Sequence, residues 1–148
     1  MILFVILGAH IFGYFFALSR VTNDLIGWVG GMDVAPIVVM IVLLIIYLIL
    51  GAFMDQVAIL ILTVPVVLPL VLSLGFDPVW FGVIVVITAE VGMVTPPMGM
   101  NVFVVARYTG RPLGELFRGT FPHVIAHILV IALMTAFPAL ILWLPSTM

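Results

Sequence analysis

The sequence has no cysteine and very little charge. The absence of cysteine from all 148 residues excludes disulfide bonds and thiol chemistry. Only 7% of the residues are Asp, Glu, Lys or Arg, whereas soluble domains have about 25%. The chain has four basic side chains, too few to form a basic patch, so nucleic acid is excluded as a partner. What remains is apolar: 66% of residues are hydrophobic and the mean hydropathy is +1.52, which predicts a chain whose solvent is the lipid bilayer.

Five hydrophobic segments predict an all-α polytopic membrane protein, with residues 1–148 forming a single membrane domain. A polar, glycine-rich stretch separates the first two segments and predicts a loop with an amphipathic part. The hydrophobic segments are residues 2–19, 35–50, 57–74, 79–106 and 120–144, and the polar stretch is residues 20–34.

Two interpretations fit residues 35–74. Each apolar half is a little shorter than the ~20 residues of a straight span, and the connector 51–56 has no Lys or Arg. One interpretation is a re-entrant hairpin with its tip at 51–56, whose irregular backbone is buried in protein or faces a water-filled cavity. The other is a pair of ordinary spans joined by a short turn.

The fourth segment, 79–106, is interrupted near its centre by TPPMG, residues 95–99. Proline has no amide hydrogen, so Pro96 leaves the carbonyl of Gly92 without its helical partner. In the same way, Pro97 frees the carbonyl of Met93. Each proline also disfavours the helical conformation of the residue before it. The segment is therefore predicted to be a discontinuous helix with its break near the bilayer midplane.

The ends of a broken helix in a membrane supply polar groups for a binding site. Carbonyl oxygens of Gly92 and Met93 suit a hard cation such as Na⁺, and the hydroxyl of Thr95 can add a ligand. The amide groups from Met98 to Asn101 begin the second half-helix and suit an anionic substrate group. The alternative is that the prolines only kink the helix for packing.

The connector 51–56 has the same character. Gly51 is expected to end one half-helix in the left-handed conformation. Asp55 is expected to cap the next by accepting a hydrogen bond from the amide of Val57 or Ala58. Cation binding by Asp55 is an equally good interpretation, and both roles are compatible.

The arginines predict the orientation of the chain. Arg107, Arg111 and Arg118 lie in one stretch, 107–118, which is therefore expected to be cytoplasmic. The loop 75–78 and the C-terminus then lie on the outer side.

Three stretches of the sequence, taken together, indicate a family resemblance. GAFMDQVAILILTVPVVLPLVLSLGFDPVWFGVIVV, EVGMVTPPMGMNVFVV and FPALILWLP resemble the large, DctM-like permease subunit of TRAP (tripartite ATP-independent periplasmic) transporters. The resemblance implies an elevator-type transporter of two inverted repeats, each with a re-entrant hairpin and a discontinuous helix. Residues 35–74 and 79–106 would be the hairpin and the broken helix of the second repeat. The chain would be the C-terminal part of the subunit, with the first repeat absent.

The resemblance also implies function, location and partners. Family members couple Na⁺ entry to the uptake of organic acids such as dicarboxylates or sialic acid, with Na⁺ as coupling ion and no cofactor. They lie in the bacterial or archaeal inner membrane with a small, DctQ-like membrane subunit, and a periplasmic binding protein delivers the substrate. The residues expected to contact substrate are Met98, Gly99 and Asn101, and those expected to contact Na⁺ are Gly51, Asp55, Gly92, Met93 and Thr95.

Two other classes of function compete with this one. A truncated, non-transporting membrane scaffold would differ in whether another chain supplies the missing repeat. An intramembrane enzyme is disfavoured, because HVIAH places His123 and His127 on one helix face without the glutamate of a zinc protease.

Overall fold

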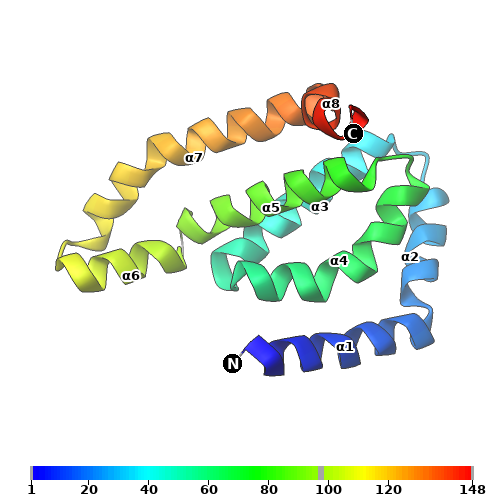
Figure 1. Cartoon of the computed structure of the whole chain (residues 1–148), viewed down its shortest axis with the longest axis horizontal. Coiled ribbons are helices and arrows are strands. Elements are labelled where there is room, and N and C mark those ends of the chain that lie inside the picture. Colours follow the sequence, from blue (N-terminus) through cyan, green and yellow to red (C-terminus); the bar gives the residue numbers. More distant parts are fainter. Residues whose placement is uncertain (1, 97–98, 148) are drawn as a thin grey trace.

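The computed structural model describes residues 2–96 and 99–147, and all regular structure within them is helical (Figure 1). Three helices, α3, α4 and α7, are long and apolar enough to cross a membrane, and the bent pair α1–α2 would be a fourth span. The predicted all-α membrane architecture is therefore confirmed at this level. The helices are α1 (Ile2–Ser19), α2 (Val21–Gly30), α3 (Pro36–Phe53), α4 (Gln56–Ser73), α5 (Pro78–Val94), α6 (Met100–Thr109), α7 (Leu113–Ala136) and α8 (Ala139–Ser146).

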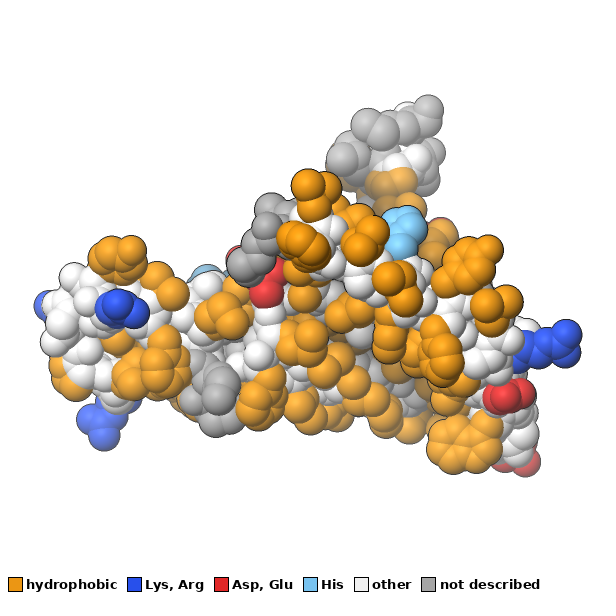
Figure 2. Space-filling view, turned by 90° about the horizontal axis from the view of Figure 1, so that it is seen from below, with side chains coloured by type: hydrophobic (Ala, Val, Ile, Leu, Met, Phe, Trp, Pro, Cys, Tyr) orange, Lys and Arg blue, Asp and Glu red, His pale blue; other side chains and the backbone are white. Residues whose placement is uncertain are grey.

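Helix α5 lies at the centre of the fold. It packs against α3 and α4 on one side and against α6, α7 and α8 on the other (Figure 1). The buried core lies between α3, α4 and α5, where the rings of Tyr47 and Phe81 meet edge to face with their centroids 6.4 Å apart. The outer surface is largely hydrophobic, with arginine side chains at the two ends of the molecule (Figure 2). Such a surface suits a chain surrounded by lipid.

Carboxylate caps fix the starts of α4 and α5. Asp55 accepts a hydrogen bond from the amide of Val57 at 3.1 Å, which confirms the predicted capping role. Asp77 accepts from the amides of Val79 and Trp80 at 2.8 and 3.1 Å, and Pro78 occupies the first helical position. The chain therefore turns sharply into both helices.

The last predicted segment differs from the structure. The hydropathy pattern predicts one helix over 120–144, whereas α7 already begins at Leu113 and a second helix, α8, follows a break at Phe137. The break arises because Pro138 has no amide hydrogen to donate to the carbonyl of Met134. The indole nitrogen of Trp80, a side chain only 1% exposed, donates to that carbonyl instead, at 3.0 Å.

The stretch 20–34 also contains more helix than expected. Its amphipathic part forms α2, with Asp24 in the first turn, where a carboxylate interacts favourably with the helix dipole. Both α1 and α2 pack against α4.

The bond from Trp80 predicts a stability difference between two tryptophans. Trp80→Phe should lower the stability of a permease carrying this segment by about 1–3 kcal/mol, because a buried carbonyl loses its donor. Thermal unfolding in detergent measures this. Trp28→Phe is the control, since Trp28 is 67% exposed on α2, and its effect should stay within about 0.5 kcal/mol. Equal effects of the two substitutions would contradict the role given to Trp80.

Candidate functional site

The connector between α3 and α4 lies on the same side of the α3–α5 core as the break between α5 and α6 (Figure 1). Helices α3 and α5 run in the same direction, and their last turns meet at two buried glycines, Gly51 and Gly92. A Cβ atom on Gly92 would lie 2.6 Å from the Cα of Gly51 and 2.6 Å from the carbonyl oxygen of Leu48. A Cβ atom on Gly51 would lie 2.5 Å from the carbonyl oxygen of Ala89. The two backbones are therefore in direct contact, and no side chain fits between them.

This contact corrects the expectation for Gly51. The residue does not end the helix in a left-handed conformation, because α3 continues to Phe53 and the chain leaves at Met54 with φ −126° and ψ 157°. The absence of a side chain at Gly51 serves helix packing instead. Helix α4 is held to the same place, since the side-chain amide of Gln56 donates to the carbonyl of Val86 on α5 at 3.2 Å.

At the break, α5 ends at Val94 and Thr95 is extended, with φ −95° and ψ 138°, as its position before proline predicts. The carbonyl of Gly92 is not left without a donor, because the amide of Thr95 donates to it at 3.0 Å. The hydroxyl of Thr95 donates to the carbonyl of Val91 at 2.6 Å. These oxygens keep free lone pairs, so they can still face a cation.

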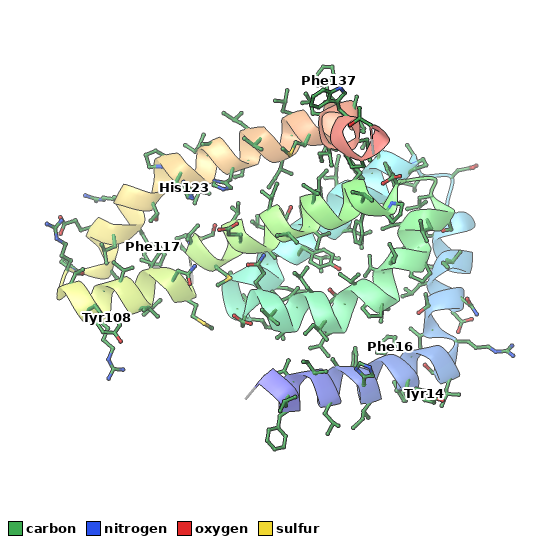
Figure 3. The ribbon with its side chains drawn as sticks, in the orientation of Figure 1. Tyr14, Phe16, Tyr108, Phe117, His123 and Phe137 are labelled. Atoms are coloured by element: carbon green, nitrogen blue, oxygen red, sulfur yellow. The ribbon has the colours of Figure 1, made fainter. Side chains whose placement is uncertain are left out.

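The second half of the broken helix begins at Gly99. This residue is buried, has φ +38° and ψ 66°, and supplies no side-chain cap to α6. The ring of Phe117 on α7 lies against it, 2.8 Å from the position of a Cβ atom (Figure 3). Asn101 lies exposed in the first turn of α6. Pro97 and Met98 lie outside the described residues.

The structure thus divides the predicted site residues into two groups. Gly51 and Gly92 meet at the junction, with Met93 and Thr95 in the turn that follows, and Asp55 lies at the adjoining tip. Gly99 and Asn101 lie beyond the break, where α6 packs against α7. Sequence reasoning missed Phe117, because nothing in the apolar pattern of α7 distinguishes it from its neighbours.

Two helix C-termini meet at the junction. The C-terminal ends of α3 and α5 both carry partial negative charge from their last carbonyl groups. In the part of the chain that the structure describes, no three His, Asp or Glu side chains form a metal cluster. A cation held here would therefore take most of its ligands from the backbone.

Comparison with known proteins identifies the family. The family model for the DctM component of the tripartite ATP-independent periplasmic transporter matches residues 1–140. The chain belongs to the TRAP transporter large permease family. TRAP large permeases are transporters and not enzymes, and they are multi-pass proteins of the bacterial inner membrane. The resemblance seen in the sequence is thereby confirmed.

Several TRAP permeases are similar to this chain. The C4-dicarboxylate TRAP transporter large permease protein DctM of Pseudomonas aeruginosa is 33% identical over 146 residues, which are 99% of this chain and 34% of the relative. The sialic acid TRAP transporter large permease protein SiaM of Vibrio cholerae is 33% identical over 142 residues, covering 96% of this chain and 33% of SiaM. The isethionate TRAP transporter permease protein DctMQ of Oleidesulfovibrio alaskensis is 31% identical over 132 residues, covering 89% of this chain and 21% of DctMQ. The chain thus spans about a third of the length of the DctM and SiaM relatives.

The backbone contact predicts a large difference between two glycines of α5. Gly92→Ala should lower the free energy of unfolding of a TRAP permease carrying this segment by about 1–3 kcal/mol, because the added methyl group overlaps α3. Gly82→Ala is the matched control, since no atom lies within 4 Å of its Cβ position and alanine favours helix by about 1 kcal/mol. Thermal unfolding in detergent compares the two. A Gly92→Ala protein as stable as the Gly82→Ala protein would rule out the contact.

Proposed function

We propose that this chain is the C-terminal part of the large membrane subunit of a Na⁺-coupled TRAP transporter for organic acids. It would form the second inverted repeat of an elevator-type permease, and the first repeat would lie in the remaining length of the subunit. The observation that carries this proposal is the backbone contact between Gly51 and Gly92, which brings two helix C-termini together beside a Pro-Pro break. That arrangement fits the discontinuous-helix sites of secondary transporters.

The position of the tip favours the re-entrant reading of residues 35–74. The tip, residues 51–56, packs against the second half of α5, at Val86, Ala89 and Gly92, before the break. Helix α6 then extends ten residues further, about 15 Å of helix, and it continues beyond the tip in Figure 1. The hairpin thus ends before the broken helix does, as a re-entrant hairpin would.

The junction would hold the coupling ion. Na⁺ is a hard cation that takes oxygen ligands, and the ends of α3 and α5 would supply carbonyl oxygens, with the Thr95 hydroxyl and the Asp55 carboxylate as further ligands. The contributing residues would be Gly51, Asp55, Gly92, Met93 and Thr95.

The start of α6 would bind the anionic group of the substrate. Its N-terminal amides carry partial positive charge, and Gly99 offers no side chain that competes for them. C4-dicarboxylates, sialic acid and isethionate, named for the relatives above, are all organic acids. Met98, Gly99 and Asn101 would make these contacts.

Two partners complete the proposed transporter. A periplasmic binding protein would deliver the organic acid, as the family description implies. A small, DctQ-like membrane subunit would accompany the permease, which agrees with the combined name DctMQ of one relative.

The proposal predicts how substitutions at the break change Na⁺ dependence. In a complete permease carrying this segment, Thr95→Ala should raise the Na⁺ concentration for half-maximal uptake by about tenfold, because an oxygen ligand is lost. Replacing Pro96 and Pro97 by alanine should restore the helix and abolish Na⁺ coupling. Uptake into proteoliposomes measures both.

Thr109→Ala is the control for this experiment. The hydroxyl of Thr109 donates to the carbonyl of Val105 at 2.8 Å, just as that of Thr95 donates within α5, but it lies at the far end of α6. Its removal should leave Na⁺ dependence unchanged. If the variant with alanine at positions 96 and 97 kept its Na⁺ dependence, the break would serve only packing or a scaffold role, and the proposed Na⁺ site would be wrong.

The arginine distribution predicts the orientation of the chain. A reporter inserted after Gly110 should lie in the cytoplasm, and one fused after Met148 should lie in the periplasm. Paired cytoplasm-active and periplasm-active reporters at both sites measure this. Cytoplasmic activity from the fusion after Met148 would invert the topology.

A further inference from the structure

A cavity of about 340 Å³ lies beside the break, between the end of α5 and the first turns of α7, and it shares Thr95 with the proposed Na⁺ site. Its volume is within the range of about 300–1,000 Å³ for small-molecule sites. None of the site residues on α6 lines it. The lining residues are Val94, Thr95, Pro96, Phe117, Arg118, Thr120, Phe121 and Val124.

Among the described residues that line the cavity, Arg118 is the one with a charged side chain. Arg111, in the same stretch 107–118, forms an ion pair with Glu115 at 3.1 Å. Arg118, in contrast, makes no ion pair or hydrogen bond within the described part of the chain. Its guanidinium group is therefore available to an incoming anion.

The two threonines of the lining do not offer donors. The hydroxyl of Thr95 donates to the carbonyl of Val91, and that of Thr120 donates to the carbonyl of Phe117. The remaining walls are aliphatic, aromatic or proline side chains. A mostly apolar cavity with one guanidinium group suits an organic anion, in which the charged group meets Arg118 and the carbon skeleton meets the walls.

Phe117 separates this cavity from the start of α6. Its ring lies against Gly99 and meets the ring of Phe103 edge to face, with centroids 6.4 Å apart (Figure 3). The same side chain lines the cavity. The cavity and the proposed substrate contacts at Gly99 are thus neighbours with one aromatic ring between them.

We propose that this cavity is the chamber through which the substrate anion leaves toward the cytoplasm, and that Arg118 receives its anionic group there. The inference rests on the proposed function and on the cytoplasmic location of residues 107–118. Arg118 lies just over one turn from the start of α7, whereas the opposite wall of the cavity is the break itself. The cavity therefore connects the break to the cytoplasmic end of α7.

The first test compares the two sides of the membrane. A complete permease carrying this segment is reconstituted with its small subunit and binding protein, and succinate, sialic acid and isethionate are tried to find the acid that the wild type transports. Arg118→Gln should raise the concentration of internal substrate for half-maximal exchange by about tenfold and leave the external value unchanged. The internal value of Arg118→Lys should lie between those of Arg118→Gln and the wild type.

Arg107→Gln is the control, because Arg107 is an exposed arginine of the same stretch that does not line the cavity. Equal internal values for Arg118→Gln, Arg107→Gln and wild type would overturn the role of Arg118. Wild-type transport without Na⁺ dependence would instead overturn the proposed function, so the two failures are distinct.

A second test leaves Arg118 in place. The segment has no cysteine, so cysteines can be introduced for labelling at two exposed positions. Phe121 is 62% exposed and lines the cavity, whereas Tyr108 is 87% exposed and does not line it. In a permease otherwise free of cysteine, the transported acid should slow maleimide labelling of Phe121→Cys from the cytoplasmic side and should not affect Tyr108→Cys. Equal labelling rates with and without the acid at both positions would contradict the chamber.

Discussion

The approach of two helix backbones at Gly51 and Gly92 is the contact on which the rest of the site depends. Helices α3 and α5 come together only because neither position carries a side chain. Their C-terminal ends then lie side by side, which concentrates carbonyl dipoles that would repel each other without a positive charge between them. The hydrogen bond from Gln56 to Val86 holds the start of α4 at the same place. A positive charge between these ends would lower that repulsion.

Two helix breaks in this chain occur at prolines, with different consequences. Pro138 frees the carbonyl of Met134, and the buried indole of Trp80 satisfies it, so that break is closed by a side chain from another helix. At the Pro-Pro break, Thr95 satisfies neighbouring carbonyls through its own amide and hydroxyl, and lone pairs remain available. In a lipid environment, where unpaired backbone groups are costly, the first arrangement is a structural joint and the second can serve as a binding site.

Local chemistry explains which features the sequence could predict. The break at Thr95 and the cap at Asp55 follow from the missing amide hydrogen of proline and from a carboxylate before a helix, and neither requires knowledge of distant residues. The role of Gly51 could not be predicted, because it depends on which helix lies opposite. The contact of Phe117 with Gly99 likewise joins elements that no local pattern connects. Helix α7 begins before the predicted apolar segment because hydropathy marks the part of a helix within lipid and not its polar first turns, where Glu115 lies.

The most direct test is an experimental structure, by electron cryo-microscopy in lipid nanodiscs, of a complete TRAP permease carrying this segment, determined once in Na⁺ and once in choline. The account predicts that the last turns of α3 and α5 touch through Gly51 and Gly92. It also predicts density for a cation, bounded by their terminal carbonyl oxygens, in Na⁺ only. Helix ends held apart by lipid or by another segment, or the same density in choline, would contradict it.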